Sequence, residues 1–149
     1  MRTVLQRVTR ASVVVGTRSV GAIERGLLAL VGVEQGDGAG DLAYTATKIR
    51  EVRLFDDDTG RMNRSVAEAG GAVLVVSQFT LLGDCRRGRR PSYDAAAPPA
   101  EARALYEDLL ERLRATGLTV ASGEFQTMMH VELINDGPVT VLLDSRKRF

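Results

Sequence analysis

The chain has 149 residues, of which 44% are hydrophobic and 26% are charged, and 20 Lys and Arg residues balance 19 Asp and Glu residues. These values are typical of one globular domain, and they exclude disordered, collagen-like and strongly basic classes of protein. The single cysteine, Cys85, excludes a disulfide framework and a cysteine-rich zinc site. The single histidine, His130, argues against a histidine-based metal site and against a Ser-His-Asp triad.

No targeting or membrane-spanning segment is predicted. The first residues contain no apolar core long enough for a signal peptide. The longest apolar stretch, residues 27–33, is far shorter than the roughly 20 residues that cross a bilayer. We therefore expect a soluble, cytoplasmic protein.

The first half of the chain predicts short strands followed by a helix. Strands are expected at residues 3–8, 12–15 and 19–24, and the turn-forming Gly16-Thr17-Arg18 joins the last two as a hairpin. The continuous apolar run at residues 27–33 predicts a strand that is buried on both faces. Helical spacing of apolar residues then predicts a helix over 41–52, with Asp41 or Asp37 as its N-cap.

The second half predicts a second buried strand, a longer helix and two final strands. The strand is expected at residues 72–79, and the helix is expected from about Pro99 to Gly117, which ends it. Strands at 128–134 and 139–143 would be joined by a turn at Asn135-Asp136-Gly137-Pro138. We expect a single α+β domain over residues 1–149, with a mostly antiparallel, barrel-like core of seven to eight strands and two main helices.

Basic residues are concentrated in one short segment. Four arginines fall within five residues, and such clusters neutralise the phosphates of nucleic acids, although by themselves they fit a solvated loop better. A phosphatase loop is rejected, because Pro91 stands where an arginine six residues after Cys85 would be needed. We refer to Arg86, Arg87, Arg89 and Arg90 as the arginine cluster.

The polar segment Ser77-Gln78-Phe79-Thr80-Leu81 lies where the second buried strand is expected to end. A rigid strand can aim functional groups at its exit, and backbone N–H groups there can form an oxyanion hole. No base lies nearby in the sequence, so an activated nucleophile is hard to build, and a polar strand terminus remains the alternative. His130 lies in an alternating strand pattern, which favours a structural or exposed side chain.

Two motifs together resemble the signatures of the D-aminoacyl-tRNA deacylase family. These motifs are Ser77-Gln78-Phe79-Thr80-Leu81 and Asn135-Asp136-Gly137-Pro138-Val139-Thr140. The resemblance covers essentially the whole chain, and the main departure is Gln126-Thr127, where the family usually has small Gly or Ala residues. Further matching segments are Gln6-Arg7-Val8-Thr9-Arg10-Ala11-Ser12-Val13, Arg61-Met62-Asn63, Gly88-Arg89-Arg90-Pro91-Ser92-Tyr93, Gly123-Glu124-Phe125 and Met129.

The resemblance implies a homodimeric hydrolase that cleaves the ester between a D-amino acid, or a wrongly attached glycine, and the 3′ end of tRNA. It implies that a Gly-cisPro element, here Gly137 and Pro138, enters the partner's active site and rejects L-aminoacyl groups. It implies a substrate-assisted route, in which the 2′-hydroxyl of the terminal adenosine helps to activate water. No metal and no cofactor are implied, and the partner would be the acceptor end of tRNA. The alternatives are a non-catalytic RNA-binding dimer of the same fold and a small-molecule hydrolase.

The resemblance also implies roles for individual residues. The backbone N–H groups of Phe79 and Thr80 would bind the carbonyl oxygen, and Thr80 is also the family's formerly proposed nucleophile. Ser77 and Gln78 would support the strand exit and contact the adenosine. The remaining assignments are Phe125 and Met129 to the pocket wall, Arg7 to bracing of the Gly-Pro segment, and the arginine cluster (Arg86, Arg87, Arg89 and Arg90) to the acceptor stem.

Overall fold

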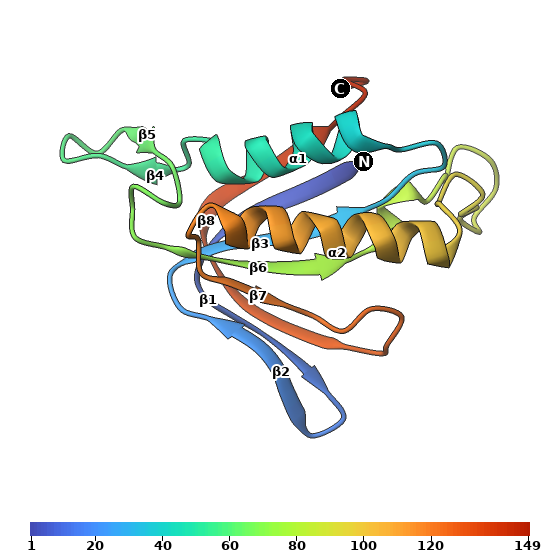
Figure 1. Ribbon diagram of the computed structural model, residues 1–149, viewed down its shortest axis with the longest axis horizontal. Helices are drawn as coiled ribbons and strands as arrows, with labels where there is room; N and C mark the ends of the chain where they lie inside the picture. The colour runs from blue at the N-terminus through green and yellow to red at the C-terminus, as the bar shows by residue number, and fades with distance from the viewer.

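The computed structural model describes residues 1–149, which form a curved sheet and two helices that lie side by side on one of its faces (Figure 1). None of its helices has the length and apolar character needed to cross a membrane. The elements in chain order are β1 Arg2–Val15, β2 Arg18–Ile23, β3 Gly26–Gly32, α1 Ala39–Glu51, β4 Phe55–Asp56, β5 Met62–Arg64, β6 Ala72–Ser77, the short 3-10 helix η1 Phe79–Leu82, α2 Pro99–Ala115, β7 Val120–Ser122 and β8 His130–Asp144.

The long strand β1 is the centre of the sheet. Its first half pairs with β3 and its second half with β2, and β8 pairs with both halves. Two separate strands were expected here, because the exposed Thr9 and Arg10 interrupt the alternation of buried residues. This interruption marks the point where β1 passes from β3 to β2, so the strand continues with a new neighbour.

The buried strands β3 and β6 explain the two continuous apolar runs. β3 and β6 pair in parallel with each other, and β6 also pairs in parallel with β7. The helices cover one of the two faces of this sheet (Figure 1). The free edges of β2 and β7 then come together, and a side chain at Gly21 would collide with the backbone carbonyl of Ser122. The sheet is therefore a nearly closed, barrel-like structure, and the predicted α+β class with two helices is confirmed.

The two helices begin and end close to the predicted residues. In α1 the N-cap is Gly38, and Asp41 lies one turn into the helix, where its carboxylate accepts a hydrogen bond from the Gly38 N–H at 3.0 Å. The prediction of Asp41 as the N-cap was therefore wrong, although the carboxylate still satisfies a free backbone donor. In α2, Pro99 is in the first turn, and Gly117 follows the helix with a φ of 85°, a conformation that favours glycine.

Two predicted strands have different ends from those expected. β6 ends at Ser77, and Phe79 and Thr80 belong to η1. The two final strands are one strand, β8, because both parts pair with β1. Between the pairs Gln6↔Thr140 and Val8↔Asn135, the chain moves five residues along β8 but only two residues along β1. Residues 136–139 therefore bulge out of the strand.

The chain's last residues are fixed to the body of the fold by ion pairs between the exposed Arg148 and two buried carboxylates. Arg148 donates hydrogen bonds to Asp144 at 2.6 Å and to Glu34 at 2.8 Å. Asp144 is buried at the last position of β8, and Glu34 is buried two residues after the end of β3. Hydrogen bonding from Arg148 lowers the pKa of Asp144 to about 2 and also lowers the pKa of Glu34.

We expect the Asp144 carboxylate to stabilise the folded state above pH 4 and to lose this contribution as the pH falls. The pKa of Asp144 is lower in the folded state than in the unfolded state, so its contribution is complete above pH 4 and is lost as the pH falls towards 2. The substitution Asp144→Asn should cost about 2 kcal/mol at pH 7 and much less near pH 2. Urea unfolding at fixed protein concentration between pH 7 and pH 2.5 measures this.

The matched control is Asp58→Asn, because the Asp58–Arg64 pair lies in solvent. Its stability curve should follow that of the wild type within about 0.5 kcal/mol. A constant difference between Asp144→Asn and the wild type over the whole pH range would contradict the assignment.

Candidate functional site

A cavity of about 630 Å³ lies at the carboxyl end of β6. The parallel strand β3 ends beside it, and the carboxyl ends of parallel strands are where ligands bind in many sheets that contain such strands. Most of its wall is apolar, with polar groups at the strand exit and at the loop before β8. The lining residues are Val33, Val76, Ser77, Gln78, Phe79, Ala96, Ala97, Pro99, Ala102, Phe125, Gln126, Thr127, Met128, Met129 and Val131.

The strand exit places backbone donors next to the cavity. The Gln78 N–H donates to the Val31 carbonyl at 2.8 Å, which extends the β3–β6 pairing by one residue. η1 begins at Phe79, and the first N–H groups of a helix have no acceptor within it. The side-chain amide of Gln78 donates to the hydroxyl of Thr80, which therefore lies beside the exit although it is not among the cavity's lining residues.

One wall of the cavity is the aromatic ring of Phe125. Tyr106 packs against this ring with a centroid distance of 5.9 Å, and the guanidinium of Arg103 lies 4.6 Å from the ring's centroid. The Tyr106 hydroxyl donates to the Val75 carbonyl at 2.9 Å, and burial raises the pKa of Tyr106 to about 12. This tyrosine is therefore a neutral donor at pH 7 and holds α2 on β6. Met129 completes this side, and its sulfur accepts from the Glu124 N–H at 3.4 Å.

Another part of the wall is formed by Ala96 and Ala97, which belong to an irregular segment that is tied to the end of β3. The Gln35 N–H donates to the Ala95 carbonyl at 2.9 Å, and the Ala97 N–H donates to the Val33 carbonyl at 3.0 Å. Glu34 lies between these two anchor points and is bound by Arg148. The ion pairs of the chain's last residues thus hold the part of the structure from which this wall is built.

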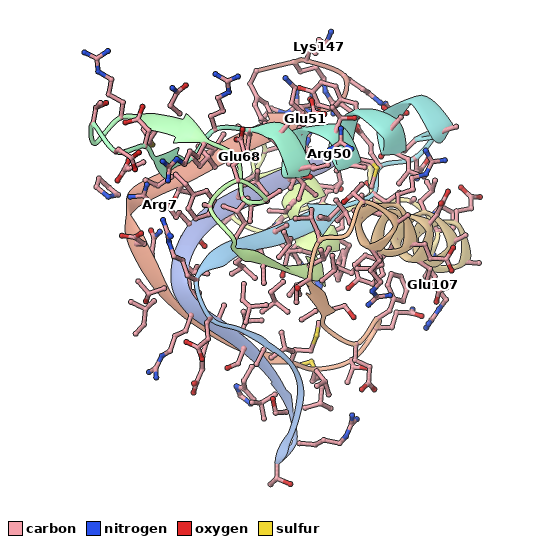
Figure 2. All side chains as sticks on the ribbon, turned by 60° about the vertical axis from the view of Figure 1, so that its left-hand side comes forward. Arg7, Arg50, Glu51, Glu68, Glu107 and Lys147 are labelled. Carbon is pink, nitrogen blue, oxygen red and sulfur yellow. The ribbon has the colours of Figure 1, made fainter.

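The bulge of β8 presents Gly137 and Pro138 at the surface. Both residues are exposed, and the peptide bond between them is cis. Arg7 lies behind the bulge: it donates to the Asp136 carbonyl at 3.3 Å and pairs with the Asp136 carboxylate at 3.0 Å. It also donates to the buried Leu54 carbonyl at 2.7 Å. Figure 2 shows Arg7 on the side of the molecule that carries the β4–β5 hairpin.

The Gly-Pro bulge and the cavity of the same chain lie at opposite ends of the sheet. The bulge faces Arg7 on β1, Arg7 pairs with Leu27 on β3, and Leu27 pairs with Val73 on β6. Ser77 lies four residues further along β6. Three strand spacings of about 4.8 Å and four residues of about 3.3 Å each give a separation of roughly 20 Å.

The arginine cluster lies on an exposed loop that follows η1. An isolated bridge between Asp84 and Ser92 closes this loop. Arg86 donates to the Asp84 carboxylate at 2.9 Å and 2.6 Å, and these hydrogen bonds hold the pKa of Asp84 well below its usual range. The other three arginines make no side-chain hydrogen bond or ion pair within the chain.

The structure brings together five of the predicted site residues, Ser77, Gln78, Phe79, Phe125 and Met129, in one cavity. Gly137, Pro138, Arg7 and the arginine cluster lie outside it. His130 and Cys85 are exposed, and neither lines the cavity. No group of three His, Cys, Asp or Glu side chains is close enough together to hold a metal ion.

Sequence reasoning missed the wall that the small residues Ala96, Ala97 and Ala102 contribute, because alanine carries no chemical signal. It also missed Tyr106 and Arg103 behind Phe125, which occupy ordinary helical positions. The rigid Pro98-Pro99 pair at the start of α2 is the one sequence signal that pointed to a fixed segment at this place.

Comparisons with known proteins identify the family of this chain. The family model described as D-Tyr-tRNA(Tyr) deacylase matches residues 4–144. The D-aminoacyl-tRNA deacylases of Koribacter versatilis (strain Ellin345) and Syntrophotalea carbinolica are each 60% identical to the chain over all 149 residues, with both chains fully covered.

Two solved structures share the fold. A c-Myc DNA unwinding element binding protein superimposes with a TM-score of 0.91 at 39% identity, over 97% of this chain and 98% of the other. A probable eukaryotic D-amino acid tRNA deacylase superimposes with a TM-score of 0.81 at 16% identity, over 95% and 97%. From the family match and the full-length relatives, the chain belongs to the D-aminoacyl-tRNA deacylase family of hydrolases.

Proposed function

We propose that this protein hydrolyses the ester bond of D-aminoacyl-tRNA and of mischarged glycyl-tRNA, and that it rejects L-aminoacyl-tRNA. The observation that carries the proposal is the cavity at the exit of β6, which lies next to the backbone donors of Phe79 and Thr80 in a chain of this family. The reaction releases free amino acid and tRNA, which is a quality-control step for translation.

The chemistry is assigned to positioning and to charge stabilisation. The Phe79 and Thr80 N–H groups bind the ester carbonyl oxygen as it becomes an oxyanion, an interaction that is worth about 10²–10³-fold in rate in other acyl-transfer enzymes. The 2′-hydroxyl of the terminal adenosine helps to activate the attacking water. Support for this substrate-assisted route comes from the lining of the cavity, which contains no histidine, lysine or carboxylate. Thr80 is the alternative nucleophile.

Chiral selection is assigned to Gly137 and Pro138 of the partner subunit. Exchanging D for L swaps the side chain and the hydrogen on the α-carbon, so a rigid wall close to that carbon excludes one of the two by steric clash. Backbone suits this purpose, because it cannot rotate away as a side chain can, and Gly137 adds no Cβ. Glycine has no side chain to clash, so the same wall admits glycyl-tRNA. Arg7 acts as a positioning residue that fixes the bulge from behind.

A homodimer is the arrangement that would unite the bulge with a cavity. The separation of roughly 20 Å along and across the sheet keeps the bulge away from the cavity of its own chain. β8 pairs on one side only, and three of its exposed residues are the apolar Leu133, Ile134 and Leu142. A long unpaired edge with apolar side chains favours association with a second copy.

The arginine cluster is assigned to the phosphates of the acceptor stem. Its loop directly follows η1, and Tyr93 on the same segment packs edge-to-face on Phe79 with a centroid distance of 5.2 Å. Phosphates bound there would place the 3′ end of the tRNA near the cavity. The related DNA unwinding element binding protein gives a second candidate, non-catalytic nucleic-acid binding, which the same loop would serve.

Hydrolysis should be stereoselective and independent of added metal. Purified protein should deacylate D-Tyr-tRNA at least about a hundredfold faster than L-Tyr-tRNA, because the proposed wall excludes the L side chain. EDTA should leave the rate unchanged. Release of the amino acid from radiolabelled tRNA measures both. Equal rates on the two substrates would refute chiral selection, and tight tRNA binding without turnover would support the non-catalytic alternative.

The dimeric origin of the site can be tested with mixed dimers of two differently tagged chains. Gly137→Ala should block the cavity of the partner without unfolding its own chain, because an added Cβ would make only ordinary contacts there, with Asn135 at 3.5 Å and with the Val139 nitrogen at 3.7 Å. Thr80→Pro removes one N–H donor at a position in the first turn of a helix, which tolerates the φ of proline. A dimer with one substitution on each chain should keep one working site and about half of the wild-type activity.

The matched control carries both substitutions on one chain opposite a wild-type chain. This dimer should have almost no activity, because each of its sites then contains one altered element. If instead it retains half of the activity and the first dimer retains none, the Gly-Pro bulge acts within its own subunit and the proposal fails.

The arginine cluster should act on tRNA and not on the ester. Each phosphate contact contributes a slope of roughly −0.9 to the dependence of log K on log salt for duplex nucleic acid. Replacing Arg87 and Arg89 with Ala should weaken tRNA binding and flatten this slope, whereas hydrolysis of D-tyrosyl-adenosine should stay at the wild-type rate. Arg112→Ala, on the exposed face of α2, is the control. Equal losses on the tRNA and on the fragment would place these arginines in the active site instead.

A further inference from the structure

Gln126 has a backbone conformation that is unusual for its residue type. Its φ is +57°, and only one other non-glycine residue of the chain, Lys147, has a positive φ. An L side chain in this left-handed region raises the free energy relative to glycine. Residues held in such conformations cluster at functional sites, and Gln126 lines the cavity at the end of β6.

The loop that carries Gln126 is held on both sides. Before it, the Glu124 carboxylate pairs with Arg18 at 2.9 Å and accepts a hydrogen bond from the Thr127 hydroxyl at 3.2 Å. Phe125, its immediate neighbour, is packed between α2 and the cavity. The backbone at Gln126 is therefore fixed by its neighbours, so its side chain leaves the loop from a defined point at the cavity wall.

The carboxamide of Gln126, an exposed residue, has no partner within the protein and is open to a ligand. It makes no hydrogen bond within the chain, whereas the nearby Thr127 and Glu124 bond to each other. The surrounding wall at Phe125 and Pro99 is apolar. The carboxamide offers an N–H donor and a carbonyl acceptor at the edge of this apolar wall. A ligand with a planar ring and hydrogen-bonding groups along the ring's edge would be complementary to both.

We propose that the Gln126 carboxamide binds the base edge of the terminal adenine, and so acts as a specificity-determining residue for the 3′ nucleotide. A carboxamide can donate and accept in parallel towards the exocyclic amine and the adjacent ring nitrogen of adenine. The adenine is also the part that every aminoacyl-tRNA shares, whereas amino-acid side chains vary. A donor and an acceptor at fixed positions can recognise the adenine in every substrate, because this part does not vary. This inference rests on the proposed function, since it takes the substrate to be an aminoacylated 3′ adenosine.

The test uses binding, which does not depend on turnover. The two probes are 3′-(D-tyrosylamino)-3′-deoxyadenosine, a non-hydrolysable amide, and the same molecule without the 6-amino group. The wild type should bind the adenine probe about fivefold more tightly, because the second probe lacks one of the two hydrogen bonds. Gln126→Gly should bind both probes equally, and more weakly than the wild type binds the second, because it loses both hydrogen bonds. Isothermal titration calorimetry gives the four dissociation constants.

Two controls separate recognition from structure. Gln126→Gly should have a melting temperature equal to or above that of the wild type, because glycine adopts this φ without steric cost. Arg112→Ala changes an exposed residue of α2 that lies outside the cavity, and it should keep the fivefold preference.

A fivefold preference that survives in Gln126→Gly would overturn the inference. A loss in Gln126→Gly that follows the amino acid, differing between D-tyrosyl and D-alanyl probes and not between bases, would assign Gln126 to the side chain of the amino acid and also overturn it. If the wild type binds with the expected preference but does not hydrolyse D-aminoacyl-tRNA, the proposed function fails while the assignment of Gln126 stands.

Discussion

The pairing of β1 with three other strands places every other part of this structure. β1 holds β3 and β2 on one edge and β8 on the other, so the cavity and the Gly-Pro bulge are both positioned relative to it. Through β3 it fixes the parallel strand β6, whose end is the strand exit at Ser77. Through the register jump opposite Arg7 it pushes residues 136–139 of β8 outward. The core around Leu5, Leu27 and Val75 keeps these strands in place.

The location of the cavity follows from the parallel pairing of β3 and β6. Parallel strands end at the same edge of a sheet, and the backbone groups beyond that edge are no longer used by the ladder. At this edge η1, the start of α2 and the loop before β8 close around one space. The ion pairs of Arg148 with Glu34 and Asp144 reach the same edge from outside, because Glu34 lies two residues after the end of β3. Stability and the shape of the site therefore depend on the same segment.

Much of this arrangement could be predicted from the sequence. The apolar runs of β3 and β6 and the periodicity of α2 gave these elements nearly at their observed bounds, because burial on one or two faces determines the pattern of apolar residues. The turn formers Asn135 to Pro138 led to a wrong prediction, because the same residues that reverse a chain can also form a bulge within one continuous strand. A turn forms if the two flanking segments pair with each other, and a bulge forms if both flanking segments pair with the same third strand. The choice between a turn and a bulge is therefore a property of the whole sheet.

The candidate site was predictable only in part for the same reason. Ser77 and Gln78 are polar residues at a strand exit, directly before Phe79, so local sequence marks this segment. Ala96, Ala97 and Tyr106 reach the site through tertiary packing alone. The roughly 20 Å between the bulge and the cavity of one chain follows from strand register, which no local pattern reveals.

The central claim is that the aminoacyl end of the tRNA binds at the exit of β6 and contacts Gly137 of the partner. The most direct measurement is a ¹⁵N–¹H NMR titration of the protein with the non-hydrolysable D-tyrosyl amide of 3′-amino-3′-deoxyadenosine. The account predicts that the largest shifts are those of the Phe79, Thr80 and Gly137 amides, and that the L-tyrosyl compound leaves them almost unchanged. Shifts confined to a different surface hollow, which is lined by Ser12 and Glu132, with Phe79 and Thr80 unaffected, would contradict it.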